Sequence, residues 1–195
     1  MNRRHSPARQ AGYLMIEVLI TMFILVVGLL GLAGLQSRAQ QAETESYQRV
    51  QALVLLRDMA DRINANRSPP ANLAIYAAVG TTNPLGTGHT GASPCAAPVT
   101  QADHDLCQWH LALLGAAETL GGSDVGAMTG ARGCITSPGA NQYLIEVSWQ
   151  GFVQTTNPLA TLICGKDSYG AEAAAATMGR RRDAATLVTI GILDP

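Results

Sequence analysis

Three residues with metal-binding side chains stand close together in the chain: His104, Cys107 and His110. Imidazole nitrogen and thiolate sulfur are ligands that zinc prefers. On a helix, however, steps of three and three residues spread such ligands across about 120° of the surface. The sequence also has no C-x-x-C pair and no H-x-x-x-H pair. The spacing therefore predicts no metal site, and we expect no cofactor.

Short patterns that often mark catalytic or phosphate-binding sites are incomplete here. Gly165-Lys166 lacks the earlier glycine and the following serine or threonine of a phosphate-binding loop. Ser123 follows two glycines, but the next two residues do not fit a nucleophile elbow. Residues 86–91 match G-x-G-x-x-G, yet Asn-Pro and Ser-Pro turns flank them where a dinucleotide site needs a strand and a helix. We therefore expect no enzymatic activity.

The composition is that of a folded, largely apolar chain. Of 195 residues, 47 % are hydrophobic and only 14 % are charged, and the formal net charge is -1. This balance excludes a disordered polyelectrolyte and gives no general basic excess for binding nucleic acid. Aromatic residues make up 5 %, so a core must be mainly aliphatic.

The apolar residues are concentrated near the N-terminus. Residues 18–35 carry no charge, and the run back to Tyr13 contains a single acid, Glu17. At about 1.5 Å per residue, a helix over residues 13–35 is about 35 Å long, which is enough to cross a bilayer core. We predict that this segment spans a membrane.

A short basic leader, residues 1–12, precedes the apolar run. It carries Arg3, Arg4 and Arg9, and positive charge on this side places the leader in the cytoplasm and the rest of the chain outside it. A signal peptide is the alternative, with cleavage around Ala33. Its apolar region would usually have about 7–15 residues, which is shorter than the run seen here.

The helical pattern continues beyond residue 35. Residues 36–66 contain no proline and no glycine, and their apolar residues recur at steps of three and four. This stripe consists of Tyr47, Val50, Leu53, Val54, Leu56, Met59, Ala60 and Ile63. Two prolines after Ser68 end the pattern. We predict one helix whose amphipathic half, residues 36–66, packs on a head formed by residues 67–195.

The predicted head is α+β, because helical patterns precede strand patterns. Residues 71–100 indicate a long surface loop, and residues 103–114 indicate a short helix capped by Asp103. A small antiparallel sheet of three or four strands is expected from residues 133–135, 141–149, 185–193 and, more weakly, 159–164. The basic run at residues 180–182 is interpreted as a solvated turn before the last strand.

Four cysteines follow the apolar segment: Cys95, Cys107, Cys134 and Cys164. Outside the cytoplasm, four cysteines favour two disulfides, for which three connectivities are possible. The pairs Cys95–Cys107 and Cys134–Cys164 are favoured because they close the shorter loops. Each bridge could contribute about 3 kcal/mol to stability.

Glu17 is the unusual residue of the apolar run. An ionised carboxylate inside a hydrophobic segment carries a large free-energy cost unless it is paired or reaches the lipid headgroups. Its context is Gly12-Tyr13-Leu14-Met15-Ile16-Glu17, in which an apolar residue follows the glycine and the acid stands five positions after it. Together with the basic leader and the apolar helix, this string resembles the prepilin peptidase motif of type IV pilins and type II secretion pseudopilins.

The resemblance extends into the head. V-G-L-L-G-L-A-G-L-Q at residues 27–36, D-L-C-Q-W at residues 105–109 and V-S-W at residues 147–149 look like the minor pilins called type IV pilus modification protein, or PilV-like. Gly34 stands where major pilins carry a kink proline, which argues against a major fibre subunit. The resemblance implies cleavage after Gly12, N-methylation at Tyr13, and pairing of Glu17 with the terminal amine of a neighbouring subunit.

The family resemblance implies a non-enzymatic assembly subunit. It would be anchored in the inner membrane by residues 13–35, with a periplasmic head, and would then enter the pilus through the same helix to help prime assembly. The implied partners are other minor pilins, the major pilin, prepilin peptidase, the inner-membrane assembly platform and the membrane itself, but no nucleic acid. A minor pseudopilin of a type II secretion system is one alternative, and a signal-anchored periplasmic enzyme is a second.

Overall fold

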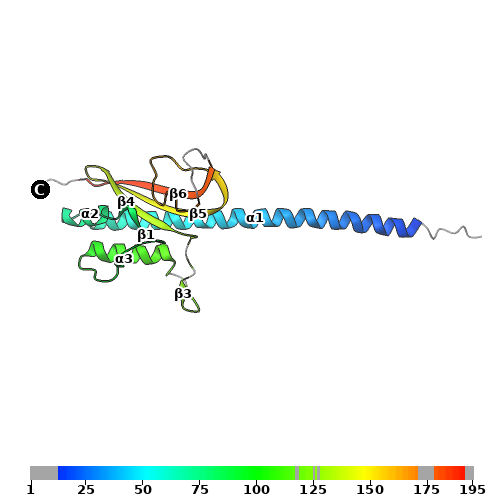
Figure 1. Ribbon diagram of the computed structural model, residues 1–195, viewed down its shortest axis with the longest axis horizontal. Helices are drawn as coiled ribbons and strands as arrows, with labels where there is room; N and C mark the ends of the chain where they lie inside the picture. The colour runs from blue at the N-terminus through cyan, green and yellow to red at the C-terminus, as the bar shows by residue number, and fades with distance from the viewer. Residues whose placement is uncertain (1–12, 117–118, 125, 127, 171–177, 192–195) are drawn as a thin grey trace, which may run out of the picture. The chain divides into compact units, whose positions relative to one another are not determined.

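The computed structural model describes residues 13–116, 119–124, 126, 128–170 and 178–191 (Figure 1). The chain divides into two compact units, Met1–Thr44 and Glu45–Pro195, which we describe separately. In the first unit all described residues belong to one helix, and the second unit holds every strand. The predicted leader, residues 1–12, lies outside the described residues.

The N-terminal helix α1 (Tyr13–Ala65) runs for 53 residues, close to the predicted range of 13–66. Its first half has no partner surface within the described chain, because the large hydrophobic side chains from Met15 to Leu35 are between 50 % and 75 % exposed. From Ala52 onward, one face of the helix is buried in the second unit. The helix therefore combines an uncovered apolar half with a half that contributes to a core.

A four-stranded antiparallel sheet has the order β1-β4-β5-β6. These strands are β1 (Gly80–Gly86), β4 (Arg132–Gly139), β5 (Gln142–Thr156) and β6 (Met178–Thr189). Two short helices, α2 (Pro70–Ala77) and α3 (Gln101–Leu114), complete the main body, and β2 (Thr119–Leu120) pairs with β3 (Ser123–Asp124) in a separate ribbon. The predicted α+β fold, with the long helix packed on a small antiparallel sheet, is confirmed.

The core lies between one face of this sheet and the helices. Alternate residues of β5 point into it, and they are the four that the sequence pattern placed on one side: Tyr143, Ile145, Val147 and Trp149. From α1 the core receives Ala52, Leu56, Met59 and Ile63. The predicted stripe is only partly correct, because its first four members, Tyr47, Val50, Leu53 and Val54, are between 42 % and 59 % exposed.

The predicted long loop at residues 71–100 is wrong in its first half, which contains α2 and β1. Pro70 occupies the first turn of α2, where its fixed φ favours a helix and its missing amide costs nothing. Leu73 and Tyr76 then fall on one buried face. A helix of eight residues, about two turns, carries too short a periodicity to stand out from an alanine-rich loop.

One predicted strand and one predicted turn need correction. Residues 159–164 form turns instead of a strand, and the basic run at residues 180–182 lies inside β6 instead of a solvated turn. Arg181 is only 3 % exposed, because its guanidinium donates to the carbonyl oxygens of Leu162 and Cys164 and pairs with Asp183. Partners from a distant turn allow this charge to be buried in a strand, and local sequence cannot reveal them.

The start of α3 also differs from the prediction. Thr100 is the N-cap residue, and its hydroxyl accepts a hydrogen bond from the amide of Asp103. The Asp103 carboxylate in turn accepts a hydrogen bond from the Thr100 amide, which completes a capping box. The hydrogen bonds that the Thr100 amide and then its hydroxyl donate to the Asp103 carboxylate lower the pKa of Asp103 below its ordinary value. The helix thus begins at Gln101, with Asp103 inside its first turn.

The two disulfides join Cys95 to Cys107 and Cys134 to Cys164, the pairs that loop length favours. The first bridge ties the segment before α3 to the helix itself. The second ties β4 to residues 157–170, which we call the strap. The strap covers the sheet face opposite the core, where Tyr169 donates a hydrogen bond to the Gly130 carbonyl and bonds the Ser148 hydroxyl.

Removing the two bridges separately should lower stability by different amounts. The bridges span sequence separations of 12 and 30 residues, so the chain-entropy argument gives about 3 kcal/mol for Cys95–Cys107 and about 4 kcal/mol for Cys134–Cys164. Denaturant unfolding of the double alanine variants in detergent micelles measures both. A larger loss for the Cys95–Cys107 variant would contradict this order.

Candidate assembly surface

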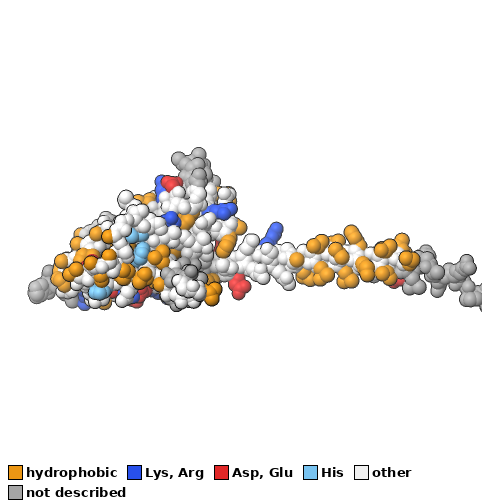
Figure 2. Space-filling view, turned by 60° about the horizontal axis from the view of Figure 1, so that its bottom comes forward, with side chains coloured by type: hydrophobic (Ala, Val, Ile, Leu, Met, Phe, Trp, Pro, Cys, Tyr) orange, Lys and Arg blue, Asp and Glu red, His pale blue; other side chains and the backbone are white. Residues whose placement is uncertain are grey.

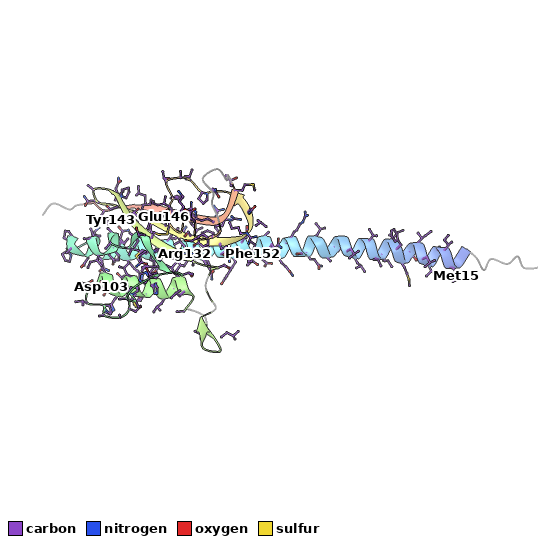
Figure 3. The ribbon with its side chains drawn as sticks, in the orientation of Figure 1. Met15, Asp103, Arg132, Tyr143, Glu146 and Phe152 are labelled. Carbon is purple, nitrogen blue, oxygen red and sulfur yellow. A yellow bond between two sulfur atoms is a disulfide. The ribbon has the colours of Figure 1, made fainter. Side chains whose placement is uncertain are left out.

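The uncovered half of α1 is the first candidate surface. Its most apolar stretch has a mean hydropathy of 2.7, none of it is buried, and the helix is long and apolar enough to span a membrane. Side chains project from it in all directions, with Met15 near its start (Figure 3). Hydrophobic side chains cover the face seen in Figure 2, and a mainly polar stretch follows them. Such a surface needs a cover of lipid or other helices.

The predicted site residues at the N-terminus fall at or before the start of this helix. Gly12 lies outside the described residues, and Tyr13 is the first residue of α1. Glu17 is exposed, one turn into the helix. Within the described chain no hydrogen bond or ion pair reaches its carboxylate. The carboxylate is thus open to a partner from outside the described part of the chain.

A second apolar surface lies on the head half of α1. It consists of the exposed side chains Tyr47, Val50, Leu53 and Val54, which we call the helix patch. Beside it is a hollow of about 230 Å³, lined by Val50, Gln51, Val54, Leu55, Ala112, Gly126 and Met128. The Gln51 amide donates to the Gly126 carbonyl at its edge. The rest of the lining is mainly apolar, so the hollow suits an apolar side chain.

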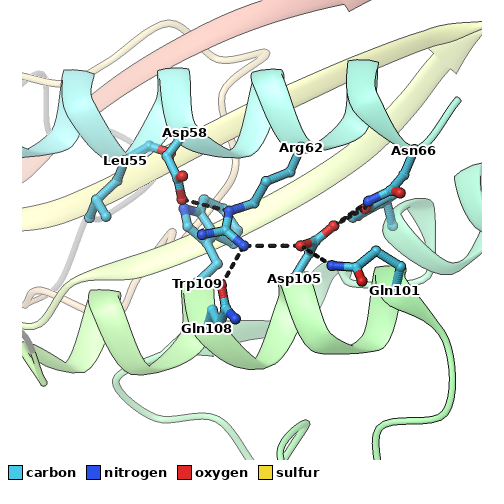
Figure 4. A network of polar contacts seen from close by, with 9 residues as sticks. Leu55, Asp58, Arg62, Asn66, Gln101, Asp105, Gln108 and Trp109 are labelled. Carbon is cyan, nitrogen blue, oxygen red and sulfur yellow. Dashed lines mark hydrogen bonds and ion pairs between the residues drawn. The ribbon is translucent and has the colours of Figure 1, made fainter.

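A buried polar network holds the end of α1 against α2 and α3 within the head (Figure 4). Asp105 on α3 is 3 % exposed, and its carboxylate accepts hydrogen bonds from Arg62 and Asn66 near the end of α1 and from Tyr76 of α2. Arg62 also donates to Asp58 at 2.9 Å and to Gln108 at 2.6 Å. One carboxylate therefore joins three helices.

The network shifts the titration of its buried phenol. Burial, and then the hydrogen bond to the Asp105 carboxylate, raise the pKa of Tyr76 well above its ordinary value. Tyr76 therefore stays protonated and keeps donating to Asp105 throughout the physiological pH range. Ionisation of the phenol therefore does not break this hydrogen bond between α2 and α3 in that range.

The string D-L-C-Q-W at residues 105–109 has a physical explanation in this network. Asp105 and Gln108 bind Arg62, Leu106 enters the core, and Cys107 forms a disulfide. Trp109 is fully buried, and its indole donates to the Leu55 carbonyl of α1 at 3.1 Å. Its ring lies against Gly133, where a Cβ atom would come within 2.5 Å of the indole. Every residue of the string thus helps to dock α3 on its neighbours.

Sequence reasoning missed Asp105 and Arg62 as partners. A signal for Asp105 was present, because it interrupts the apolar face of α3 formed by Ala102, Leu106, Trp109 and Leu113. A carboxylate on a buried helix face requires a donor. No sequence pattern identifies Arg62 as that donor, because 43 residues separate the two in the chain.

A second polar cluster lies beneath the strap. Cys134 and Glu146 are opposite each other on β4 and β5, and Glu146 is 1 % exposed. Its surroundings include Arg181 and the backbone amides of Ile163 and Cys164 in the strap. Burial raises the pKa of Glu146 above its ordinary value, while those amides and Arg181 partly oppose the shift. The cluster attaches the strap through polar contacts and one covalent bond.

The three residues with metal-binding side chains do not form a site. His104 is exposed, and Cys107 is bound to Cys95. His110 is buried, and its Nδ1 atom accepts a hydrogen bond from the Gly86 amide, with 3.0 Å between the two nitrogen atoms. Among the described residues, no three His, Cys, Asp or Glu side chains lie where they could hold a metal ion.

Replacing Asp105 with alanine should cost about 3 kcal/mol of unfolding free energy, because Arg62 and Tyr76 lose their shared acceptor in a mostly buried setting. The matched control is Asp58→Ala, which removes the other carboxylate from Arg62. The Asp58 side chain is 39 % exposed, so its loss should cost less than about 1 kcal/mol. Denaturant unfolding measures both, and equal losses would contradict the central role of Asp105.

His110 should make the head less stable in mild acid. Burial, and then the nearby His89, lower its pKa below the ordinary value of about 6.5. The unfolded chain therefore takes up a proton first as the pH falls, which favours unfolding below about pH 6.5. His110→Asn retains an acceptor for the Gly86 amide without titrating.

The test compares unfolding free energies between pH 7 and pH 5. Wild type should lose more stability over this interval than His110→Asn, whatever the variant's stability at pH 7. His104→Asn is the exposed control and should follow wild type. The same pH slope in wild type and His110→Asn would disprove the assignment.

Comparison with known proteins gives one family. Residues 34–108 match the family model described as Tt1218-like, type IV pilin Tt1218. The matched range includes the head half of α1, α2, β1 and most of α3 with the D-L-C-Q-W string. This supports a type IV pilin, which is a structural subunit. No curated protein and no solved structure matches the chain.

Proposed function

We propose that this chain is a minor pilin that takes part in the assembly and priming of a type IV pilus. The observation that carries the proposal is the apolar half of α1, none of which is buried, joined to a head with its own core and two disulfides. The type IV pilin match over residues 34–108 supports it. A pilus supplies what this helix lacks, because the apolar helices of many subunits cover one another.

Before assembly, the same helix half anchors the chain in the inner membrane, with the head in the periplasm. The basic leader supports this orientation, and the two disulfides suit an oxidising compartment. Prepilin peptidase cleaves after Gly12, and the new N-terminus at Tyr13 is methylated. Cleavage leaves a positive amine at the end of an apolar helix.

Glu17 pairs with that amine on a neighbouring subunit. Its carboxylate is exposed on α1, so a neighbour can reach it. In water such a pair contributes only about 1 kcal/mol at 4 Å, but the coupling is far stronger where helices exclude water. The pair therefore forms mainly in the assembled bundle. It favours the position along the pilus axis at which Glu17 of one subunit meets the N-terminal amine of its neighbour.

The helix patch and its hollow give the head a surface for its neighbours. Tyr47, Val50, Leu53 and Val54 present apolar side chains where the core of this chain ends. Minor and major pilins are the partners that we expect there, and the assembly platform contacts the chain while it is still in the membrane. The matching family model describes a type IV pilin, so we favour a pilus over a type II secretion pseudopilus.

Replacing Glu17 with alanine or glutamine should separate membrane insertion from assembly. Without the carboxylate, the precursor should insert and be processed at least as well as wild type. Incorporation should fall at least tenfold, because the amine of the neighbour would be buried without a partner. Processing is measured by the size of the membrane-bound chain, and incorporation by its recovery in sheared pili.

The matched control is Glu43→Gln, which removes an exposed acid from the same helix beyond its apolar half. This variant should be processed and incorporated like wild type. Wild-type incorporation of both Glu17 variants would mean that the acid only reaches the lipid headgroups, and would contradict the pairing.

A further inference from the structure

The four-stranded sheet has two edges, β1 and β6, and they differ in how well they resist further pairing. An edge strand leaves backbone N–H and C=O groups unpaired, and proteins usually block such edges with prolines, charges, bulges or short strands. β1 has several of these features. It has seven residues, contains Pro84, and has a register break between Gly80 and Leu85.

The second half of β6 lacks all of these features. Residues 184–189 read A-A-T-L-V-T, with no charge, proline or glycine, and several of them favour strands. Their pairing with β5 is unbroken from Ala184 opposite Val147 to Thr189 opposite Gln142. This regular, uncharged edge is the kind of strand that accepts another strand.

The outward backbone groups of this edge can be identified from the pairing. The Ile190 amide donates to the Asn141 carbonyl, so it points toward β5. Backbone direction alternates along a strand, so the N–H and C=O groups of Ala185, Leu187 and Thr189 point away from β5. All three side chains are exposed, Leu187 by 52 %. Within the described chain, no backbone hydrogen bond joins these three residues to a segment outside the sheet.

A second copy of the chain is the alternative occupant of this edge. Parallel pairing of two β6 strands in register would bring their exposed Arg180 side chains side by side, and like charges on neighbouring strands are unfavourable. Antiparallel pairing of two β6 strands is a separate outcome of the test below. Pairing of β6 with β1 of another copy is opposed by Pro84, which has no amide to donate.

We propose that the outer edge of β6 at residues 185–189 binds an extended strand from a different protein. In antiparallel addition, the C-terminal end of the added strand lies beside the N-terminal part of β6, where Arg180 is exposed. The partner strand is therefore uncharged over its paired residues, and it carries an acidic residue or a terminal carboxylate at its C-terminal end.

A synthetic peptide tests this proposal with the full chain in lipid nanodiscs. The probe is acetyl-Thr-Val-Thr-Val-Thr-Val-Asp with a free carboxyl terminus, and residue-resolved amide exchange is the measurement. At saturating peptide, exchange at Ala185, Leu187 and Thr189 should slow at least tenfold, while the amides of β1 stay unchanged. A peptide ending in lysine amide should bind at least fivefold more weakly.

Variants at the edge decide whether the backbone is responsible. Ala185→Pro removes an outward amide without removing a hydrogen bond to β5, so it should abolish the slowing of amide exchange by the peptide. Ala185→Thr keeps the amide and should bind the peptide like wild type. If Ala185→Pro loosens β6, Leu187→Lys blocks the edge by charge and should weaken binding at least tenfold. These changes lie far from Glu17 in sequence, so N-terminal processing should remain normal. Peptide binding at the β6 edge can therefore fail or succeed independently of the proposed function.

Three results would overturn the proposal. The first is slow amide exchange at residues 185, 187 and 189 in the absence of peptide, at the rate of amides in the middle of the sheet. The edge would then already be covered. The second is no slowing by saturating peptide. The third is self-association of the wild-type chain that Ala185→Pro abolishes, because the occupant would then be a second copy.

Discussion

An apolar half-helix that its own chain leaves uncovered is the constraint on which the rest of this protein depends. The large side chains between Met15 and Leu35 are at least half exposed, and no other described segment of the chain covers them. Lipid and the apolar helices of other subunits are the covers that the chemistry allows. Both covers are compatible with the type IV pilin match, and the function that we propose has the helix pass from the first cover to the second.

Under the proposed function, the head must remain folded while the apolar helix half moves from lipid into a pilus, and the contacts that stabilise the head are suited to that. Asp105 joins three helices through Arg62, Asn66 and Tyr76, and two disulfides restrict the segment before α3 and the strap. These contacts lie within the second compact unit, so they do not depend on what covers the first. The helix patch and the β6 edge remain available to partners because the core does not use them.

Long periodic patterns could be predicted from the sequence, and contacts between distant segments could not. The helix over Tyr13–Ala65 and the alternating residues of β5 follow from local spacing alone. α2 was missed because a helix of eight residues has too little periodicity, and Arg181 was misplaced because its partners are carbonyl groups of the strap. Asp105 was visible as a charge on an apolar helix face, but its donor Arg62 was not. The disulfide pairs agree with loop length because short loops close at lower entropic cost.

The most direct test of the central claim is the mass of the N-terminal peptide of the chain recovered from sheared surface filaments. Our account predicts a peptide that begins at Tyr13 and carries one added methyl group, because an apolar helix retained after leader cleavage is what enters the filament. A mature N-terminus near Ala33 or beyond would mean that the apolar half of α1 is discarded as a signal peptide, and would contradict the account.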